Sequence, residues 1–226
     1  FIGEAEAGIV RLAAGEDPHH VPGVLFPGAS EGSRGEEIRP LDSLPFPDWS
    51  LSDYRFYAHR STGKLGFKKS GSLDMMMGRG CAYKCNFCAY PAMSSVRFYS
   101  AGYLVEQIRY MRNEFGVGSI FFTDSSIGQS QKLLREFCEL MIGQGDSRRI
   151  EWYGSMRANQ VDEELLRLVW KAGCRFLLYG FESGSQRMLD LMDKKVTVEQ
   201  NYRAAEWHNA LRFPYCASML LGYPGE

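Results

Sequence analysis

The sequence lacks the features that would place it among membrane, secreted or nucleic-acid-binding proteins. No apolar run approaches the ~20 residues that cross a bilayer, and the start has no basic head followed by an apolar segment. The formal net charge of −1 argues against a broadly basic surface, so we expect no nucleic-acid partner. Three of the six cysteines fall within eight residues and the other three lie far apart, which favours metal chemistry in a reducing compartment over disulfides. We therefore expect a cytoplasmic protein without a membrane span.

Residues 1–69 contain many turn signals and little periodicity, so we interpret them as a connector and the tail of a preceding domain. The sequence begins at Phe1 rather than at a methionine and stops at Glu226, so we expect both ends to lie inside a longer protein. Prolines within residues 41–49 forbid a helix there. The connector should pack on its neighbour through apolar side chains: Leu44, Phe46 and Trp49.

Residues 55–69 contain five basic residues and no acidic one. A solvated hairpin is the plainer interpretation of such a stretch. Contact with an anionic substrate is the alternative.

From residue 70 onward, short apolar runs alternate with amphipathic stretches. The apolar runs predict strands at 73–77, 119–123, 152–156, 176–179 and 215–221. The intervening segments predict helices around 100–111, 133–140, 161–172, 185–192 and 197–211. This alternation implies parallel pairing with right-handed crossovers. We predict an α/β fold, either an open or closed barrel with its site at the carboxyl ends of the strands or a flat doubly wound sheet.

Three cysteines, Cys81, Cys85 and Cys88, follow the first predicted strand with the spacing Cys-x3-Cys-x2-Cys. A structural zinc site normally has four Cys or His ligands, and an electron-transfer cluster also uses four thiolates. The remaining cysteines lie far away, in or beside predicted core elements: Cys138, Cys174 and Cys216. Three thiolates on a cubane leave one iron open to a cofactor or substrate, so we predict that this loop is an iron–sulfur site.

With Phe87 directly before the last cysteine, this loop resembles the hallmark of the radical S-adenosylmethionine (SAM) superfamily. The resemblance implies that a 4Fe-4S cluster binds the amino and carboxylate groups of SAM through its open iron. One electron, from a donor such as flavodoxin or ferredoxin, then yields methionine and a 5′-deoxyadenosyl radical. The barrel of this family has six strands, so the resemblance predicts that residues 70–226 form a partial (βα)6 TIM-like barrel, truncated after its fifth strand.

The resemblance extends to the segment after the fourth predicted strand. Residues 180–185 are similar to the family's Gly-x-Glu-Ser-Gly-Ser segment, which implies that Glu182 accepts hydrogen bonds from the ribose hydroxyls of SAM. An acid at a helix N-terminus beside a glycine turn is the alternative interpretation.

Four further positions are candidates for contact with SAM. Asp124 follows the second strand and could meet the ammonium group, while Ser155 and Arg157 follow the third. Arg157 could pair with the methionine carboxylate, although a surface arginine is the alternative. Gly222 lies in a turn that resembles one whose backbone contacts adenine in the family, where glycine permits close approach. We expect Asp124, Arg157, Glu182 and the three cysteines to converge at one end of the sheet, with the three sulfurs close enough for one cubane.

Residues 3–6 and 41–47 resemble the junction of cobalamin-binding radical SAM proteins. The resemblance implies cobalamin in the full-length protein and a methyltransferase, or a related ring-forming cyclase, acting on a small molecule. A methylthiotransferase of tRNA or ribosomal protein is one alternative, although its upstream domain would carry cysteines and none precedes Cys81. A non-catalytic iron–sulfur binding module is another, but it leaves Glu182 without a purpose.

Overall fold

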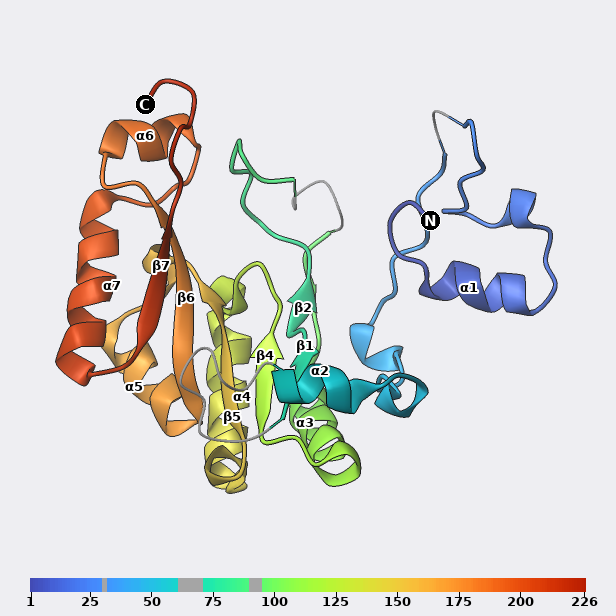
Figure 1. The fold of residues 1–226 in the computed structure, drawn as a ribbon, viewed down its shortest axis with the longest axis horizontal. Helices are drawn as coiled ribbons and strands as arrows, with labels where there is room; N and C mark the ends of the chain where they lie inside the picture. Colours follow the sequence, from blue (N-terminus) through green and yellow to red (C-terminus); the bar gives the residue numbers. More distant parts are fainter. Residues whose placement is uncertain (30–31, 61–70, 90–94) are drawn as a thin grey trace.

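The computed structural model describes residues 1–29, 32–60, 71–89 and 95–226, and its centre is a five-stranded parallel sheet (Figure 1). The strands are β1 (Ser72–Met75), β4 (Ser119–Phe122), β5 (Glu151–Met156), β6 (Cys174–Glu182) and β7 (Tyr215–Met219). They lie side by side in their order along the chain. A doubly wound sheet reverses its strand order at a switch point. The unbroken order therefore confirms the predicted partial α/β barrel and excludes the flat alternative.

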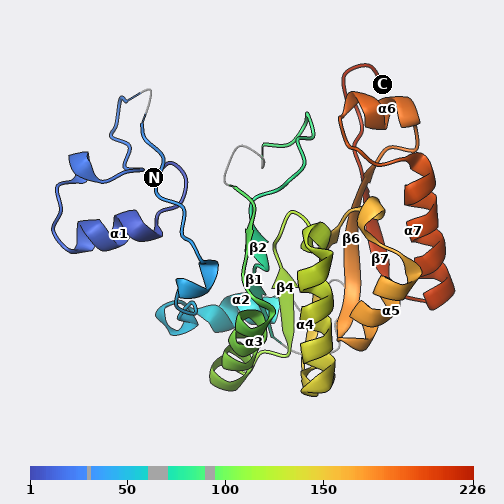
Figure 2. The ribbon, with the colours of Figure 1, turned by 180° about the vertical axis from the view of Figure 1, so that it is seen from behind.

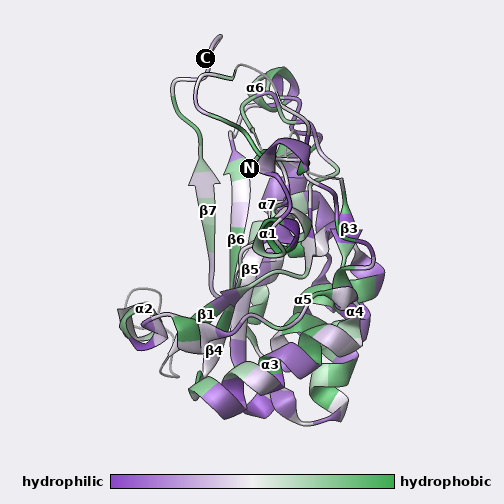
Figure 3. Ribbon diagram, turned by 90° about the vertical axis from the view of Figure 1, so that its right-hand side faces the viewer, coloured by the Kyte–Doolittle hydropathy of each residue, from purple (hydrophilic) through white to green (hydrophobic). Residues whose placement is uncertain are grey.

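Helices cover one face of this sheet, as Figures 2 and 3 show from behind and from the side. They are α3 (Ala101–Phe115), α4 (Gln131–Gly143), α5 (Glu163–Lys171) and α7 (Val198–Leu211), and the shorter α6 (Gln186–Leu191) lies beyond the carboxyl ends of the strands. Each of the four longer helices follows a residue whose side chain accepts a backbone N–H of the first turn: Ser100, Ser130, Asp162 and Thr197.

An aromatic cluster holds the helical layer against the middle of the sheet. The rings of Phe122, Phe137 and Trp152 are fully buried and meet edge to face, with centroids 5.6–5.7 Å apart. This geometry is the preferred one for aromatic pairs. It fixes β4 and β5 on α4, and the carboxyl ends of these strands are where the predicted site lies.

The buried end of α7 is fixed to β6 by a histidine. His208 Nδ1 lies 2.8 Å from the carbonyl oxygen of Phe213, and Nε2 lies 2.9 Å from the hydroxyl of Tyr179. A carbonyl can only accept, so Nδ1 carries the proton and Nε2 accepts from the tyrosine. Burial lowers the pKa of His208, although the bond to Phe213 opposes the shift.

The observed strands match the predicted ones to within a few residues, except near the cysteine loop. The run predicted at 73–77 ends as a strand at Met75, and the chain then enters a two-stranded antiparallel hairpin of β2 (Gly78–Arg79) and β3 (Arg97–Phe98). A Cβ at Gly78 would lie 2.4 Å from the carbonyl oxygen of Arg97, so glycine permits the close approach of the two strands. The sequence prediction did not include this hairpin.

The described residues before β1 include two short helices, α1 (Glu6–Ala13) and α2 (Tyr54–Arg60). The predicted packing of the connector is confirmed: the ring of Phe46 lies 4.9 Å from that of Tyr103, and the Tyr103 hydroxyl donates to the carbonyl of Leu44 at 3.0 Å. Trp49 packs against the main core. Within the described ranges, no helix combines the length and apolar character that a bilayer crossing requires.

The basic stretch at 55–69 falls only partly within the described residues. Its first part belongs to α2 rather than to a hairpin, because Ala58 is buried in the core and Tyr54 contacts Phe115. Residues 61–69 lie outside the described residues, so both interpretations of that part stay predictions.

Candidate functional site

The carboxyl ends of β5 and β6 and the loop after β2 border a pocket of about 380 Å³. This volume lies within the ~300–1,000 Å³ that is usual for ligand pockets. The lining includes most of the predicted site residues: Cys81, Cys85, Phe87, Cys88, Ser155, Arg157 and Glu182. The loop and α6 both lie beyond the carboxyl ends of the strands (Figure 1). The structure thus brings these residues together, while their individual roles stay predictions.

The cysteine loop is held from two sides. On one side, Oε1 of Gln129 accepts the backbone N–H of Ala82 at 2.9 Å. On the other side, Asn86 donates its backbone N–H to the carbonyl of Met192 at 2.9 Å and its side-chain amide to that of Leu191 at 2.8 Å. The loop therefore bridges the region after β4 and the end of α6.

The three cysteines differ in exposure, because Cys85 is buried, Cys81 is half-buried and Cys88 is exposed. The N–H of Cys88 donates to the carbonyl of Cys85 at 3.0 Å, which folds the loop back on itself. In the described part of the chain, no three Cys, His, Asp or Glu side chains gather at the spacing of a metal site. The expectation that the sulfurs already lie as close as in one cubane is therefore not met.

A metal site rarely exists preformed without its metal. Here all three thiols lie on one short loop and line one pocket. The donor set, three thiols without a fourth nearby cysteine, fits a cluster with one open iron.

Glu182 ends β6 and forms a buried ion pair with Lys194. Nζ of Lys194 lies 2.8 Å from Oε1 of Glu182, and the two side chains are 7% and 11% exposed. Glu182 has a φ of 62°, a left-handed conformation that is uncommon for a residue with a side chain and concentrates at functional sites. A Cβ at Gly180 would lie 2.2 Å from Oε1 of Glu182 and 2.8 Å from Nζ of Lys194, so glycine leaves the space that the ion pair occupies.

Arg157 connects this ion pair to the cysteine loop. Its guanidinium carbon lies 3.6 Å from the ring centroid of Tyr83, Nη1 lies 3.5 Å from Sγ of Cys85, and Nη2 donates to the carbonyl of Lys194. Arg157 is buried, which rules out the surface-arginine alternative. Among the described residues, its Nε has no hydrogen-bond partner. A buried, unsatisfied donor beside the thiols fits an anionic group of a bound ligand.

Two predicted site residues lie elsewhere. Asp124 is buried outside the pocket, and its carboxylate oxygens each accept a backbone N–H at 2.9 Å, from Met77 and Gly78. Burial raises the pKa of Asp124 to about 6, although both bonds oppose the shift. Asp124 thus fixes the turn between β1 and β2, and this geometry gives no support to its predicted contact with an ammonium group. Gly222 is exposed outside the pocket, where its N–H donates to Glu226.

Sequence reasoning missed Lys194. This residue follows α6 in a run of charged residues that is typical of a solvated turn, and it belongs to no motif with a recognisable spacing. Its inward position depends on the left-handed conformations of its neighbours Asp193 (φ 50°) and Lys195 (φ 56°). Its ammonium nitrogen also lies 5.7 Å from the ring centroid of Phe87, so Lys194 touches both walls of the pocket.

Residues 75–226, well over half of the chain, match the model of the radical SAM superfamily. The chain belongs to the radical SAM superfamily.

Individual relatives and solved structures are similar to most of the chain. The anaerobic magnesium-protoporphyrin IX monomethyl ester cyclase of Cereibacter sphaeroides is 29% identical over 216 residues, covering 89% of this chain and 34% of the cyclase. The radical SAM methyltransferase TsrM of Kitasatospora setae, solved with tryptophan and a SAM analogue, has a TM-score of 0.77 at 18% identity, covering all of this chain and 46% of TsrM. The cobalamin-dependent SAM radical enzyme OxsB has a TM-score of 0.74 at 20% identity, covering 96% of this chain and 32% of OxsB. These two structural matches show a shared fold, and the chain spans less than half the length of each relative.

Proposed function

We propose that this chain is the cluster- and SAM-binding part of a radical SAM enzyme. Cys81, Cys85 and Cys88 would hold a 4Fe-4S cluster, and SAM would lie between the cysteine loop and the end of β6. The observation that carries the proposal is the single pocket that these cysteines share with Arg157 and the Glu182–Lys194 pair. When bound and reduced, the cluster supplies the electron that breaks the sulfonium bond of SAM.

The polar groups of the pocket have distinct tasks in this proposal. Oε1 of Glu182 accepts a hydrogen bond from Nζ of Lys194, and Oε2 would accept hydrogen bonds from the ribose hydroxyls. The free Nε of Arg157 and the ammonium of Lys194 offer positive charge to the methionine carboxylate. Phe87 and Leu178 add apolar lining that limits the access of water to the reacting bond.

For the full-length protein, we propose a cobalamin-dependent methyltransferase or a related cyclase that acts on a small molecule. Two kinds of evidence support this: the sequence similarity to the magnesium-protoporphyrin ester cyclase, and the fold shared with TsrM and OxsB over nearly the whole chain. A flavodoxin or ferredoxin would supply the electron. Titrating the full-length protein with hydroxocobalamin, followed by its visible spectrum, tests the cobalamin part separately.

Anaerobic reconstitution tests the cluster. The wild-type chain should take up about four irons and four sulfides, and alanine at Cys81, Cys85 or Cys88 should abolish the charge-transfer absorbance. Cys216→Ala is the matched control for Cys88, because both thiols are exposed and Cys216 does not line the pocket. Stoichiometric zinc with no iron uptake would contradict the proposal.

SAM binding and cleavage form the second test. With a reduced cluster, the protein should form 5′-deoxyadenosine slowly without substrate. Glu182→Ala should weaken SAM binding by about 1–3 kcal/mol, because ribose hydroxyls would lose their acceptor in a buried site. Glu199→Ala, which removes an exposed acid of α7, should leave the affinity unchanged. Equal affinities of wild type and Glu182→Ala would remove Glu182 from the site without affecting the cluster assignment.

A further inference from the structure

The neck of the cysteine loop contains two arginines that face each other. The neck is the β2–β3 hairpin, and Arg79 of β2 is directly opposite Arg97 of β3. The chain between these two strands carries all three cysteines of the loop. Like charges directly opposite in an antiparallel pair destabilise it. The hairpin that closes the loop therefore requires a negative charge from elsewhere.

Glu4 supplies that charge to both arginines. Its Oε2 lies 3.0 Å from Nη1 of Arg79 and 3.1 Å from Nη1 of Arg97, and its Oε1 pairs with Nη2 of Arg97. The three side chains are 9%, 15% and 5% exposed, so water screens this cluster little. Burial tends to raise the pKa of Glu4, but the bonds to Arg97 and Ile38 and the nearby Arg79 lower it overall, so the carboxylate is ionised at neutral pH.

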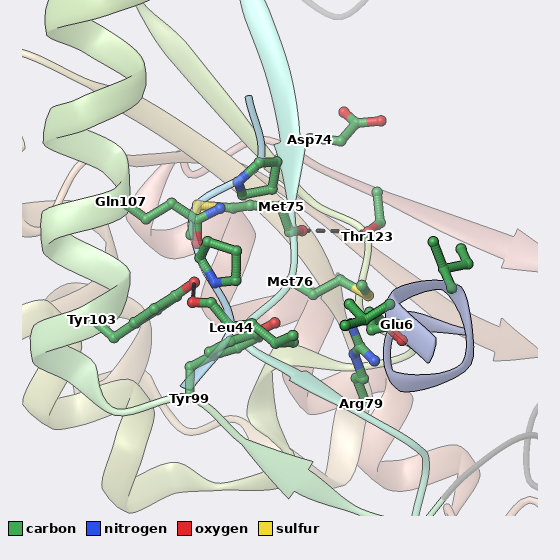
Figure 4. Close-up of a pocket in the computed structure, with 14 residues that line it drawn as sticks. Glu6, Leu44, Asp74, Met75, Met76, Arg79, Tyr99, Tyr103, Gln107 and Thr123 are labelled. Carbon is green, nitrogen blue, oxygen red and sulfur yellow. Dashed lines mark hydrogen bonds and ion pairs between the residues drawn. The ribbon is translucent and has the colours of Figure 1, made fainter. Parts of the chain in front are cut away.

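Two further carboxylates reinforce the same attachment. Glu6 pairs with Nη2 of Arg79 at 2.5 Å, and Figure 4 shows these two side chains next to each other. On the β3 side, Glu37 accepts the backbone N–H of Ser95 at 2.7 Å. Residues from the start of the chain thus fasten the two ends of the cysteine-bearing segment, at residue 79 and at residues 95–97.

Apolar packing contributes little to this attachment. A cavity of about 590 Å³ lies between α1 and the barrel, with Met76 and Tyr99 among its lining residues (Figure 4). Ile9 and Val10 of α1 also line it, and they remain 54% and 68% exposed. Because α1 does not bury these side chains on the barrel, the ionic contacts of Glu4 and Glu6 carry the attachment beside the loop.

We propose that Glu4 is a positioning residue for the cysteine loop, which it holds closed by neutralising Arg79 and Arg97 together. Without its charge, the pairs of Glu6 with Arg79 and of Glu37 with Arg97 remain, but no carboxylate bridges the two arginines. Their repulsion across the hairpin then opens the neck, and the three thiols lose the fixed spacing of their anchor points. The proposal goes beyond SAM cleavage, and only its cluster-retention test rests on the proposed function.

Hydrogen exchange of the cluster-free protein tests the positioning directly. Glu4→Gln keeps the shape of the side chain and removes its charge. The amides of residues 78–88 should then exchange at least about tenfold faster, the response to a broken buried charge cluster. Glu36→Gln is the matched control, because Glu36 is an exposed acid of the same segment that pairs with Arg11 at 3.5 Å and not with the hairpin. Far-ultraviolet circular dichroism checks that each variant is folded.

A double variant separates positioning from simple tethering. Arg97→Met in the Glu4→Gln background removes the repulsion between Arg79 and Arg97 but does not restore the ion pairs of Glu4 with the hairpin. Slow loop exchange should therefore return in Glu4→Gln/Arg97→Met. If Glu4→Gln accelerates exchange only in residues 1–38, or if the double variant exchanges as fast as the single one, the proposal is wrong.

Cluster retention gives a second measurement. After reconstitution, Glu4→Gln should lose iron to a chelator several-fold faster than wild type and Glu36→Gln, and equal rates would count against the proposal. A wild-type chain that takes up no iron would overturn the proposed function, whereas the exchange experiment would still decide the role of Glu4.

Discussion

Replacing Lys194 with methionine should destabilise the folded chain by about 3 kcal/mol, because it leaves the carboxylate of Glu182 buried without its cation. At 2.8 Å, two unit charges attract by about 6 kcal/mol at an effective dielectric constant of about 20. Desolvation of both ions offsets much of this attraction, and removing one partner of a buried pair typically costs ~3–5 kcal/mol. We take the lower end, because the pair borders a pocket that water can enter.

Urea unfolding of the cluster-free protein at neutral pH measures this cost. The set comprises Lys194→Met, Glu182→Gln and the double variant, which together form a double-mutant cycle. The coupling energy should be about 2 kcal/mol, and the double variant should be more stable than Lys194→Met, because it contains no unpaired charge. Lys195→Met is the matched control, because Lys195 is the adjacent, exposed lysine. The urea midpoint of this variant should equal that of the wild type. A coupling energy below about 0.5 kcal/mol would refute the reasoning.

Three further predictions concern neighbouring features. Gly180→Ala should weaken SAM binding by about 1–3 kcal/mol, because the methyl group displaces the ion pair, whereas Gly184→Ala, where the methyl group meets open space, should not; calorimetry compares the two. The free energy of unfolding, measured with urea, should be about 1–3 kcal/mol lower for Asp124→Ala than for Asp124→Asn. Both variants remove the charge, but only asparagine keeps an acceptor for a buried N–H. Because burial lowers the pKa of His208, the unfolded chain binds this proton first as pH falls. Stability should therefore drop below pH ~6.5, by up to about 1.4 kcal/mol per pH unit, and His208→Gln should remove that slope in unfolding titrations.

The fold could be predicted because its elements are encoded locally. The strands of the sheet are apolar runs, and the helices between them follow capping residues such as Ser100 and Thr197. The spacing of apolar residues and the helix caps therefore predict the order of strands and helices. Parallel strands in sequence order then place their carboxyl ends at one edge. This explains why the cysteine loop, Arg157 and Glu182 were correctly expected to lie together.

The features that sequence reasoning did not indicate involve partners that are distant in the chain. Asp124 was expected at a strand end, where it lies, but its carboxylate is used by two backbone amides more than forty residues earlier. Lys194 reaches the pocket through a turn of two left-handed residues that have side chains, which no propensity predicts. The β2–β3 hairpin is too short to show a period, and its pairing depends on charges at the start of the chain.

Two of the attachments of the cysteine loop, its neck and its contact with α6, become available at very different times during synthesis on the ribosome. Glu4 and Glu37 are translated before the cysteines, so the neck of the loop can close as soon as residue 97 has left the exit tunnel. The other attachment, from Asn86 to Leu191, spans 105 positions and cannot form until α6 has been made. In a nascent chain, the loop that carries the thiols can therefore be closed at its neck but not yet attached to α6 through the translation of about half of the barrel. An iron–sulfur carrier that delivers its cluster only to a loop already attached to α6 would have to act after α6 emerges from the ribosome.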